Sequence, residues 1–242
     1  MTQEEFEAKY VNTIVCGDCL DVMKDWPDGC VDLVLTDPPY GIGLNHSNLR
    51  RGRGYRTYDP NCRSIDWPEV VGDNKPFDPR PFLRFRNIIF WGANHYSSRL
   101  PDSHFWLAWD RKCGRGADND STDVELAWVK GLHYKTVRIF RHMWVGFQRD
   151  SEIGDKHLHP TQKPIALFEW CLSWFPNCRI ILDPYCGAGA SCIAAKEMGI
   201  KYIGIDISED YCEIARQRLE SVDTGVPVKE ARKGQGALFA QP

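Results

Sequence analysis

The sequence lacks any apolar run long enough to cross a membrane, and its first ten residues, MTQEEFEAKY, lack the basic start and apolar core of a signal peptide. We therefore expect a cytoplasmic protein with no membrane partner. The chain also lacks a surplus of basic charge: its formal net charge is −3 at pH 7, so any contact with nucleic acid must be local. Among ten scattered cysteines only Cys16 and Cys19 have C-x-x-C spacing, without a second pair or a His-x-His set. We predict reduced thiols and no metal site.

The chain has 242 residues, enough for one α/β domain with a full core. We assign residues 1–220 to this domain, and we predict a flexible tail for the polar, glycine-bearing residues 221–242. Short apolar runs predict strands, and apolar residues at helical spacing predict helices. The predicted strands are 12–16, 31–36, 87–91, 104–109, 124–130, 135–140, 179–182 and 202–205, with 124–130 and 135–140 as a hairpin around Gly131; the predicted helices are 19–26, 163–175, 190–198 and 208–220.

The rest of the chain is organised around the stretch VDLVLTDPPY, residues 31–40. Neither Pro38 nor Pro39 has a backbone N–H, and each fixes its own φ, so the loop after the strand is stiff. The Asp37 carboxylate and the Pro38 carbonyl offer acceptors with no proline N–H to compete for them. A planar group with two N–H bonds fits them, such as the exocyclic amine of a nucleobase on whose ring Tyr40 stacks. For these four residues alone, a proline-stiffened turn capped by Asp37 is an alternative.

A strand, a glycine turn and a helix follow one another late in the chain. Gly187 and Gly189 let the backbone approach a ligand, and Asp206, seventeen positions after Gly189, is placed to hold a ribose diol. A nicotinamide dinucleotide fits less well, because Cys192 takes the place of the third glycine of G-x-G-x-x-G. The acidic entry at Asp183 disfavours a pyrophosphate and suits a cofactor with an ammonium and a sulfonium, which S-adenosylmethionine carries.

Five motifs occur between residues 12 and 220 in the order GDC, DPPY, HPTQKP, DPYCGAGA and GIDIS. With this order the chain resembles the beta-class DNA amino-methyltransferases. The resemblance implies an α/β fold, namely the mostly parallel, seven-stranded, Rossmann-like sheet of the S-adenosylmethionine-dependent methyltransferases with a circularly permuted motif order, and sites at the carboxyl ends of the strands. It also implies Asp37, Pro38, Pro39 and Tyr40 as the catalytic residues.

The resemblance further implies the cofactor site, with GDC beside the adenine, Asp206 on the ribose and HPTQKP around the methionine end. For Asp18 an N-cap is an equal alternative. Asp206 stands where the family more often has glutamate, and Ala190 replaces the usual hydroxyl residue. The implied cofactor-binding residues are Asp18, His159, Thr161, Gln162, Lys163, Pro164, Asp183, Pro184, Tyr185, Gly187, Gly189 and Asp206.

The segment 41–77 is too long for a simple connector, and we interpret it as the target-recognition insert. Its LRRGRGYRTY sequence combines arginines and tyrosines without an acid, which fits phosphate contact, base stacking or both. A solvated, mobile loop is the alternative. A second cluster of basic residues, Arg138, Arg141 and His142, lies near Trp144 and Phe147 in the sequence. It forms either a DNA-facing edge or the rim of an aromatic core. The predicted nucleic-acid-binding residues are Arg50, Arg51, Arg53, Tyr55, Arg56, Arg138 and Arg141.

We therefore predict a site-specific methyltransferase, bacterial or phage-encoded, that acts on double-stranded DNA and belongs to the kind of enzyme found in restriction-modification systems. Adenine N6 is favoured because DPPY accompanies adenine, and SPPY cytosine, more often in the family. The alternative targets are cytosine N4 and, after it, an amine in RNA. The alternative classes of protein are a non-catalytic DNA-binding protein of the same fold and, as a distant third class, a dehydrogenase. In the tail, Gln235, Leu238 and Phe239 resemble a sliding-clamp peptide, a pattern that also arises by chance. The sequence leaves open whether the chain forms a homodimer.

Overall fold

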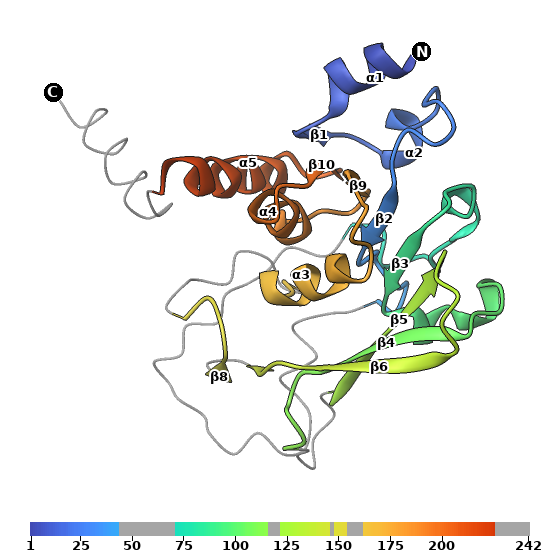
Figure 1. The fold of residues 1–242 in the computed structure, drawn as a ribbon, viewed down its shortest axis with the longest axis vertical. Coiled ribbons are helices and arrows are strands. Elements are labelled where there is room, and N and C mark those ends of the chain that lie inside the picture. Colours follow the sequence, from blue (N-terminus) through green and yellow to red (C-terminus); the bar gives the residue numbers. More distant parts are fainter. Residues whose placement is uncertain (44–70, 116–121, 146–147, 154–161, 226–242) are drawn as a thin grey trace, which may run out of the picture. The chain divides into compact units, whose positions relative to one another are not determined.

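The computed structural model describes residues 1–43, 71–115, 122–145, 148–153 and 162–225 (Figure 1). The chain divides into two compact units: unit 1 comprises Met1–Thr36 and Gln162–Pro242, and unit 2 comprises Asp37–Thr161. Within the described residues no helix combines the length and apolar character needed to span a bilayer. The assignment of residues 1–220 to one methyltransferase domain, with 41–77 as its insert and 221–242 as a tail, stays a prediction.

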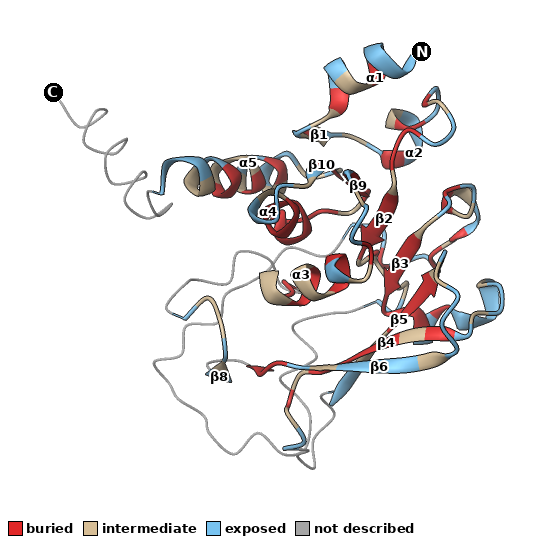
Figure 2. Cartoon of the chain, in the orientation of Figure 1, coloured by how far each residue is buried: buried red, intermediate tan, exposed pale blue. Residues whose placement is uncertain are grey.

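Unit 1 contains a parallel four-stranded sheet. In spatial order its strands are β1 (Thr13–Cys16), β10 (Lys201–Asp206), β9 (Ile180–Asp183) and β2 (Leu33–Thr36). Both β9 and β2 are buried along their whole length (Figure 2), as expected of continuous apolar runs in a parallel sheet. Because the strands are parallel, they all end on the same side of the sheet, its carboxyl edge. The last residues of the strands lie there: Cys16, Asp206, Asp183 and Thr36.

Five helices belong to the described part of unit 1: α1 (Gln3–Tyr10), α2 (Cys19–Val22), α3 (Ile165–Ser173), α4 (Ala190–Glu197) and α5 (Glu209–Thr224). The central α4 contacts both α3 and α5, and its first six residues are all buried. Ser208 caps the N-terminus of α5 by accepting the N–H of Tyr211, and Gly225, with a φ of 66°, ends the helix in the left-handed region.

Unit 2 contains a mixed sheet. Its strands in spatial order are β3 (Ile88–Trp91), β5 (Val124–Lys130), β4 (Phe105–Asp110) and β6 (Thr136–Arg141). The strand β5 is antiparallel to both neighbours, whereas β4 and β6 are parallel. Three tryptophans, Trp91, Trp109 and Trp128, are at most 1% exposed and form the centre of its core. The remaining elements are the 3₁₀ helices η1 (Arg80–Phe82), η2 (Ala93–His95) and η3 (Ser97–Arg99) and the strand pair β7 (Trp144–Val145) and β8 (Gln148–Arg149).

The α/β class and the mostly parallel sheet are confirmed: the pairings β1–β10, β10–β9, β9–β2 and β4–β6 are parallel, whereas β3–β5 and β5–β4 are antiparallel. The late strand β9 pairs in parallel with the early strand β2. Unit 1 contains four of these strands and unit 2 another four, whereas the resemblance implied a sheet of seven strands. The helix predicted at 19–26 ends at Val22, and the last helix continues to Thr224.

The predicted hairpin of 124–130 and 135–140 is wrong. The two segments form strands, but β4 lies between them, antiparallel to β5 and parallel to β6. The physical reason lies in their side chains. Ala127, Trp128 and Val129 of β5 are buried in succession and need neighbours on both sides, whereas β6 exposes Val137 and Ile139 and takes the edge of the sheet.

Candidate active site

Asp206 ends β10 at the carboxyl edge of the unit 1 sheet. Its carboxylate accepts the backbone N–H groups of Gly187 and Ser208, each at 2.9 Å. Burial raises the pKa of the Asp206 carboxyl above its usual range, although these backbone N–H groups oppose the rise. Since a carboxylate has about four lone-pair directions, Asp206 can also accept hydrogen bonds from a pair of neighbouring hydroxyls, such as those of a ribose.

The glycine turn between β9 and α4 is held in place by α5. Gly187 has a φ of 49° and Gly189 a φ of 79°, a region that favours glycine. A Cβ on Gly189 would lie 2.9 Å from the Cβ of Ala215, so this glycine allows α5 to pack closely. Arg218 of α5 is buried and donates to the carbonyl of Ala188 at 2.6 Å. Arg218 was not predicted, because its only signal in the sequence is its place on the apolar side of a helix.

Asp183 ends β9 and is 3% exposed. The hydroxyl of Thr36, at the end of β2, donates to its Oδ1 at 2.6 Å, and the N–H of Tyr185 donates to the same oxygen at 3.1 Å. The hydroxyl of Ser191 in α4 donates to Oδ2. Both carboxylate oxygens therefore join the ends of two strands to the start of a helix. Thr36 and Ser191 were not predicted, and the contact of Asp183 with a cofactor ammonium stays a prediction.

The GDC turn follows β1 at the same edge. The N–H of Gly17 donates to the carbonyl of Asp206 at 2.9 Å, so the turn lies beside the end of β10. Asp18 is the N-cap of α2, and its carboxylate accepts the N–H of Leu20 at 2.8 Å. The structure thus bears out the capping alternative for Asp18, and its contact with an adenine stays a prediction.

Only the second half of HPTQKP is described. Gln162 and Lys163 are buried, and Pro164 is the N-cap of α3, one residue before the helix begins at Ile165. Proline is tolerated there because the first helical N–H groups need no intrahelical acceptor. His159 and Thr161 lie outside the described residues, and their predicted roles are untested.

The DPPY loop opens unit 2. The hydroxyl of Tyr40 donates to Oδ1 of Asp37 and so closes the loop across Pro38 and Pro39. Burial and the neighbouring Asp37 and Glu125 carboxylates raise the pKa of Tyr40 well above its usual value, so this hydroxyl keeps its proton at neutral pH. One face of the Tyr40 ring stacks on the imidazole of His95, with the ring centroids 4.8 Å apart and the planes 15° from parallel.

Two residues that the sequence analysis missed support this loop. Asp73 is 6% exposed, and its Oδ1 accepts the N–H groups of Gly41 at 2.8 Å and Ile42 at 3.3 Å. Gly92 follows β3 with a φ of 66°, and a Cβ there would lie 1.9 Å from Cε1 of Tyr40. Gly92 therefore leaves the space in which Tyr40 lies. No local pattern marks either residue, because each acts on a segment more than thirty residues away in the chain.

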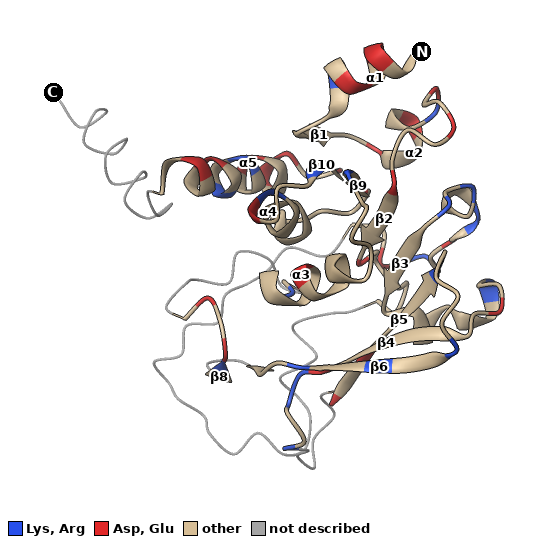
Figure 3. Cartoon of the chain, in the orientation of Figure 1, with Lys and Arg blue, Asp and Glu red and all other residues tan. Residues whose placement is uncertain are grey.

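The predicted DNA-binding residues are only partly described. Arg138 and Arg141 are exposed on the edge strand β6, on which Figure 3 colours the basic residues blue. They are three positions apart, so their side chains leave the strand on opposite faces and do not form one basic patch. Arg141 also pairs with Asp110, at 3.7 Å between Nε and Oδ2. The remaining predicted contacts lie outside the described residues and stay predictions: Arg50, Arg51, Arg53, Tyr55 and Arg56 for DNA, and Gln235, Leu238 and Phe239 for a clamp.

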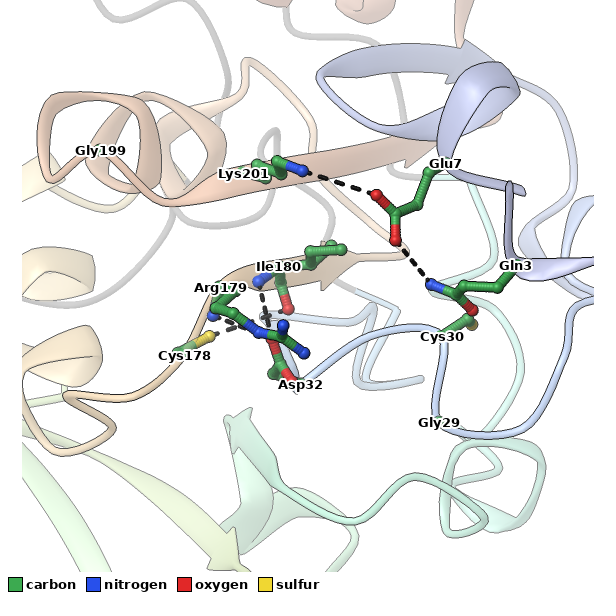
Figure 4. A pocket seen from close by; sticks show the side chains of 10 residues that line it. All are labelled: Gln3, Glu7, Gly29, Cys30, Asp32, Cys178, Arg179, Ile180, Gly199 and Lys201. Atoms are coloured by element: carbon green, nitrogen blue, oxygen red, sulfur yellow. Dashed lines mark hydrogen bonds and ion pairs between the residues drawn. The ribbon is translucent and has the colours of Figure 1, made fainter. Parts of the chain in front are cut away.

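A pocket of about 350 Å³ lies at the other edge of the unit 1 sheet, where Ile180 and Lys201 begin their strands (Figure 4). Its charged groups are paired with one another. Lys201 lies 3.6 Å from Glu7, and Nε of Arg179 lies 3.8 Å from Oδ2 of Asp32. The Asp32 carboxylate also accepts the backbone N–H groups of Arg179 and Ile180 at 2.9 and 3.0 Å. The charged side chains of this pocket are paired, and the pocket lies at the ends of the strands opposite to their carboxyl ends. It is therefore not the candidate active site.

Comparison with known proteins gives a family. A family model described as DNA methylase, for N6 and N4 methyltransferases, matches residues 82–217, which is more than half of the chain. The type II methyltransferase M.HinfI of Haemophilus influenzae is 25% identical over 262 residues, covering 88% of this chain and 69% of that protein.

Solved structures show the same fold. The M1.HpyAVI–SAM complex superposes with a TM-score of 0.50 at 20% identity, covering 86% of this chain and 98% of that one. The PvuII DNA methyltransferase, described as cytosine-N4-specific, superposes with a TM-score of 0.56 at 11% identity, covering 91% of this chain and 89% of that one. Because the family model matches more than half of its residues, the chain belongs to the DNA methylase family of N6 and N4 methyltransferases.

Proposed function

We propose that this protein transfers the methyl group of S-adenosylmethionine to the exocyclic amine of a flipped-out base in double-stranded DNA, with adenine N6 as the target. The observation that carries the proposal is the DPPY loop. Its Asp37 carboxylate is held by the Tyr40 hydroxyl across two prolines, next to an aromatic ring on which a base can stack. The Tyr40 hydroxyl takes one of the roughly four lone-pair directions of a carboxylate.

The unit 1 edge fits S-adenosylmethionine. Asp206 offers carboxylate oxygens beside the N–H groups of the glycine turn, as a ribose diol requires. Asp18 follows β1 and Asp183 ends β9, the strands on either side of β10, and both carboxylates suit a cationic ligand better than a pyrophosphate. The M1.HpyAVI structure with SAM supports the same assignment for a protein of this fold. We include Gln162, Lys163, Pro164, Pro184 and Tyr185 in the proposed site, and His159 and Thr161 by resemblance.

Asp37 and Pro38 make the amine nucleophilic. When bound, S-adenosylmethionine supplies an electrophilic methyl group on a sulfonium. The base amine donates its two N–H bonds to the Asp37 carboxylate and the Pro38 carbonyl, which localises the nitrogen lone pair as the nitrogen becomes tetrahedral. The lone pair forms the new N–C bond, the C–S bond breaks with its electrons on sulfur, and the surplus proton passes to Asp37 and on to water. Tyr40 orients the base ring throughout.

The choice of adenine rests on the DPPY sequence and its resemblance to adenine enzymes. Adenine N6 and cytosine N4 present nearly the same amine, and the PvuII enzyme of this fold is described as cytosine-N4-specific. Cytosine N4 is therefore the second candidate. The roles proposed for Asp37 and Tyr40 are the same for adenine and for cytosine, since either amine donates the same two N–H bonds.

The test uses purified protein, unmethylated bacterial DNA and RNA, and S-adenosylmethionine labelled in its methyl group. Label in DNA from the wild type but not from Asp37→Ala supports the proposal, with Asp102→Ala, an exposed aspartate, as the matched control. Label in RNA alone would reassign the substrate. No label in either, with cofactor binding shown by a raised melting temperature, would support a non-catalytic DNA-binding protein.

A further inference from the structure

His95 occupies a stacking face of Tyr40. The two rings lie 4.8 Å apart and within 15° of parallel, the geometry that a flipped base would adopt on the same tyrosine. Stacked at this distance, they leave no room for a base between them. An imidazole and a nucleobase are both flat, nitrogen-containing rings, so they compete for the same π face.

The surroundings leave His95 able to move. It is exposed and ends the three-residue helix η2. The next residue, Tyr96, is fixed, because it is 1% exposed and its hydroxyl donates to the carbonyl of Trp91 at 2.6 Å. Tyr40 is fixed as well, by its hydrogen bond to Asp37. A change of the His95 side-chain rotamer can therefore uncover the tyrosine without disturbing the core below it.

We propose that His95 is a positioning residue that covers the stacking face of Tyr40 in the absence of DNA and yields this face to the flipped base. The inference rests on the proposed function, since it concerns how the base enters that site. His95 then opposes base entry by the free energy of one aromatic stack. Removing the imidazole should tighten productive DNA binding by about two- to tenfold.

The first test follows the His95 ring itself by NMR of protein with ¹³C-labelled histidine. The His95 signals are identified by their loss in His95→Asn, and their ring-current shift by its loss in Tyr40→Leu. Duplex DNA that contains the methylation site, mapped by sequencing DNA treated with the wild type, is then added with S-adenosylhomocysteine. We expect the His95 protons to move downfield toward the position of an exposed histidine. His95 signals that keep their upfield shift with DNA bound would overturn the proposal. So would signals that move further upfield, because these would show a base stacked between His95 and Tyr40.

The second test is a graded series of side chains. His95→Ala should lower the KM for DNA by about two- to tenfold with a smaller change in kcat, His95→Phe should resemble the wild type, and His95→Trp should raise the KM. Ser98→Ala, an exposed change in η3, is the matched control. A higher KM for His95→Ala would make the imidazole a favourable wall of the base pocket and contradict the proposal. Failure of the proposed function looks different, because the wild type then methylates no DNA at all.

Discussion

The substitution Gly92→Ala tests whether Tyr40 is held where the structure places it. Gly92 has a φ of 66°, which costs a residue with a Cβ about 1–2 kcal/mol. The added Cβ would also lie 1.9 Å from Cε1 and 2.1 Å from Cζ of Tyr40. Non-bonded carbons approach to only about 3.5 Å. The backbone here is held between β3 and η2, with the N–H of His95 on the carbonyl of Gly92 at 3.0 Å, so the tyrosine ring must leave.

Departure of the ring has a cost that can be estimated. It breaks the hydrogen bond to the Asp37 carboxylate, about 1.5–3 kcal/mol, and the stack on His95, about 0.5–1.5 kcal/mol. With the backbone term, the free energy of unfolding falls by about 3–6.5 kcal/mol, an upper limit because the displaced ring finds other contacts. Loss of the base-stacking surface lowers kcat/KM for methyl transfer by about 10- to 100-fold.

The assays are urea unfolding and incorporation of labelled methyl groups into DNA. Gly199→Ala is the matched control, because Gly199 has a φ of 71° and nothing within 4 Å of its added Cβ, so it reports the backbone term alone. In a Tyr40→Ala background, Gly92→Ala should cost no more than Gly199→Ala. A Gly92→Ala variant that matches this control in the wild-type background and methylates DNA as fast as the wild type would show that Tyr40 does not lie against Gly92.

Further predictions concern the DPPY loop of unit 2 and Asp206 of unit 1. Tyr40→Phe keeps the stack and loses the hydroxyl, so the free energy of unfolding falls by about 1.5 kcal/mol in urea titrations; no change would mean that the bond to Asp37 is unimportant. Asp73→Ala, which orphans the N–H groups of Gly41 and Ile42, should cost about 1–3 kcal/mol in the same assay. The raised pKa of Asp206 predicts that affinity for S-adenosylmethionine, measured by calorimetry, rises with pH through a pKa above the usual aspartate range, and Asp206→Asn should flatten this profile and weaken binding at least tenfold. The raised pKa of Asp206 also makes the free energy of unfolding depend on pH, with the opposite sign. Because the pKa of Asp206 is higher in the folded than in the unfolded chain, its contribution to stability is complete below the unfolded pKa and is lost as pH rises through the folded pKa.

Much of the site could be predicted from the sequence because its motifs follow strands. Short apolar runs such as VDLVLT and RIILD identify buried strands, and the residues after them then fall at the carboxyl edge of the sheet. The glycine turn and Asp206 were placed in this way, and the hydrogen bond of Gly187 to Asp206 joins them. The role of DPPY came from resemblance together with the chemistry of its acceptors.

The rest could not be predicted because it depends on contacts between distant segments. Thr36 and Asp183 are 147 positions apart, and no pattern in either motif indicates their hydrogen bond. The arrangement of β5 and β6 failed for a related reason. Chain proximity and Gly131 favoured a hairpin, but the burial demanded by Trp128 placed β5 between two other strands.

The most direct test of the account is the identity of the nucleoside that this protein methylates. Wild type, Asp37→Ala and Asp102→Ala are incubated with unmethylated DNA and labelled S-adenosylmethionine, and the DNA is digested to nucleosides and separated. We predict N6-methyladenine from the wild type and Asp102→Ala and none from Asp37→Ala. N4-methylcytosine would keep the mechanism and change the base, whereas a methylated base formed equally well by Asp37→Ala would contradict the central role of the DPPY loop.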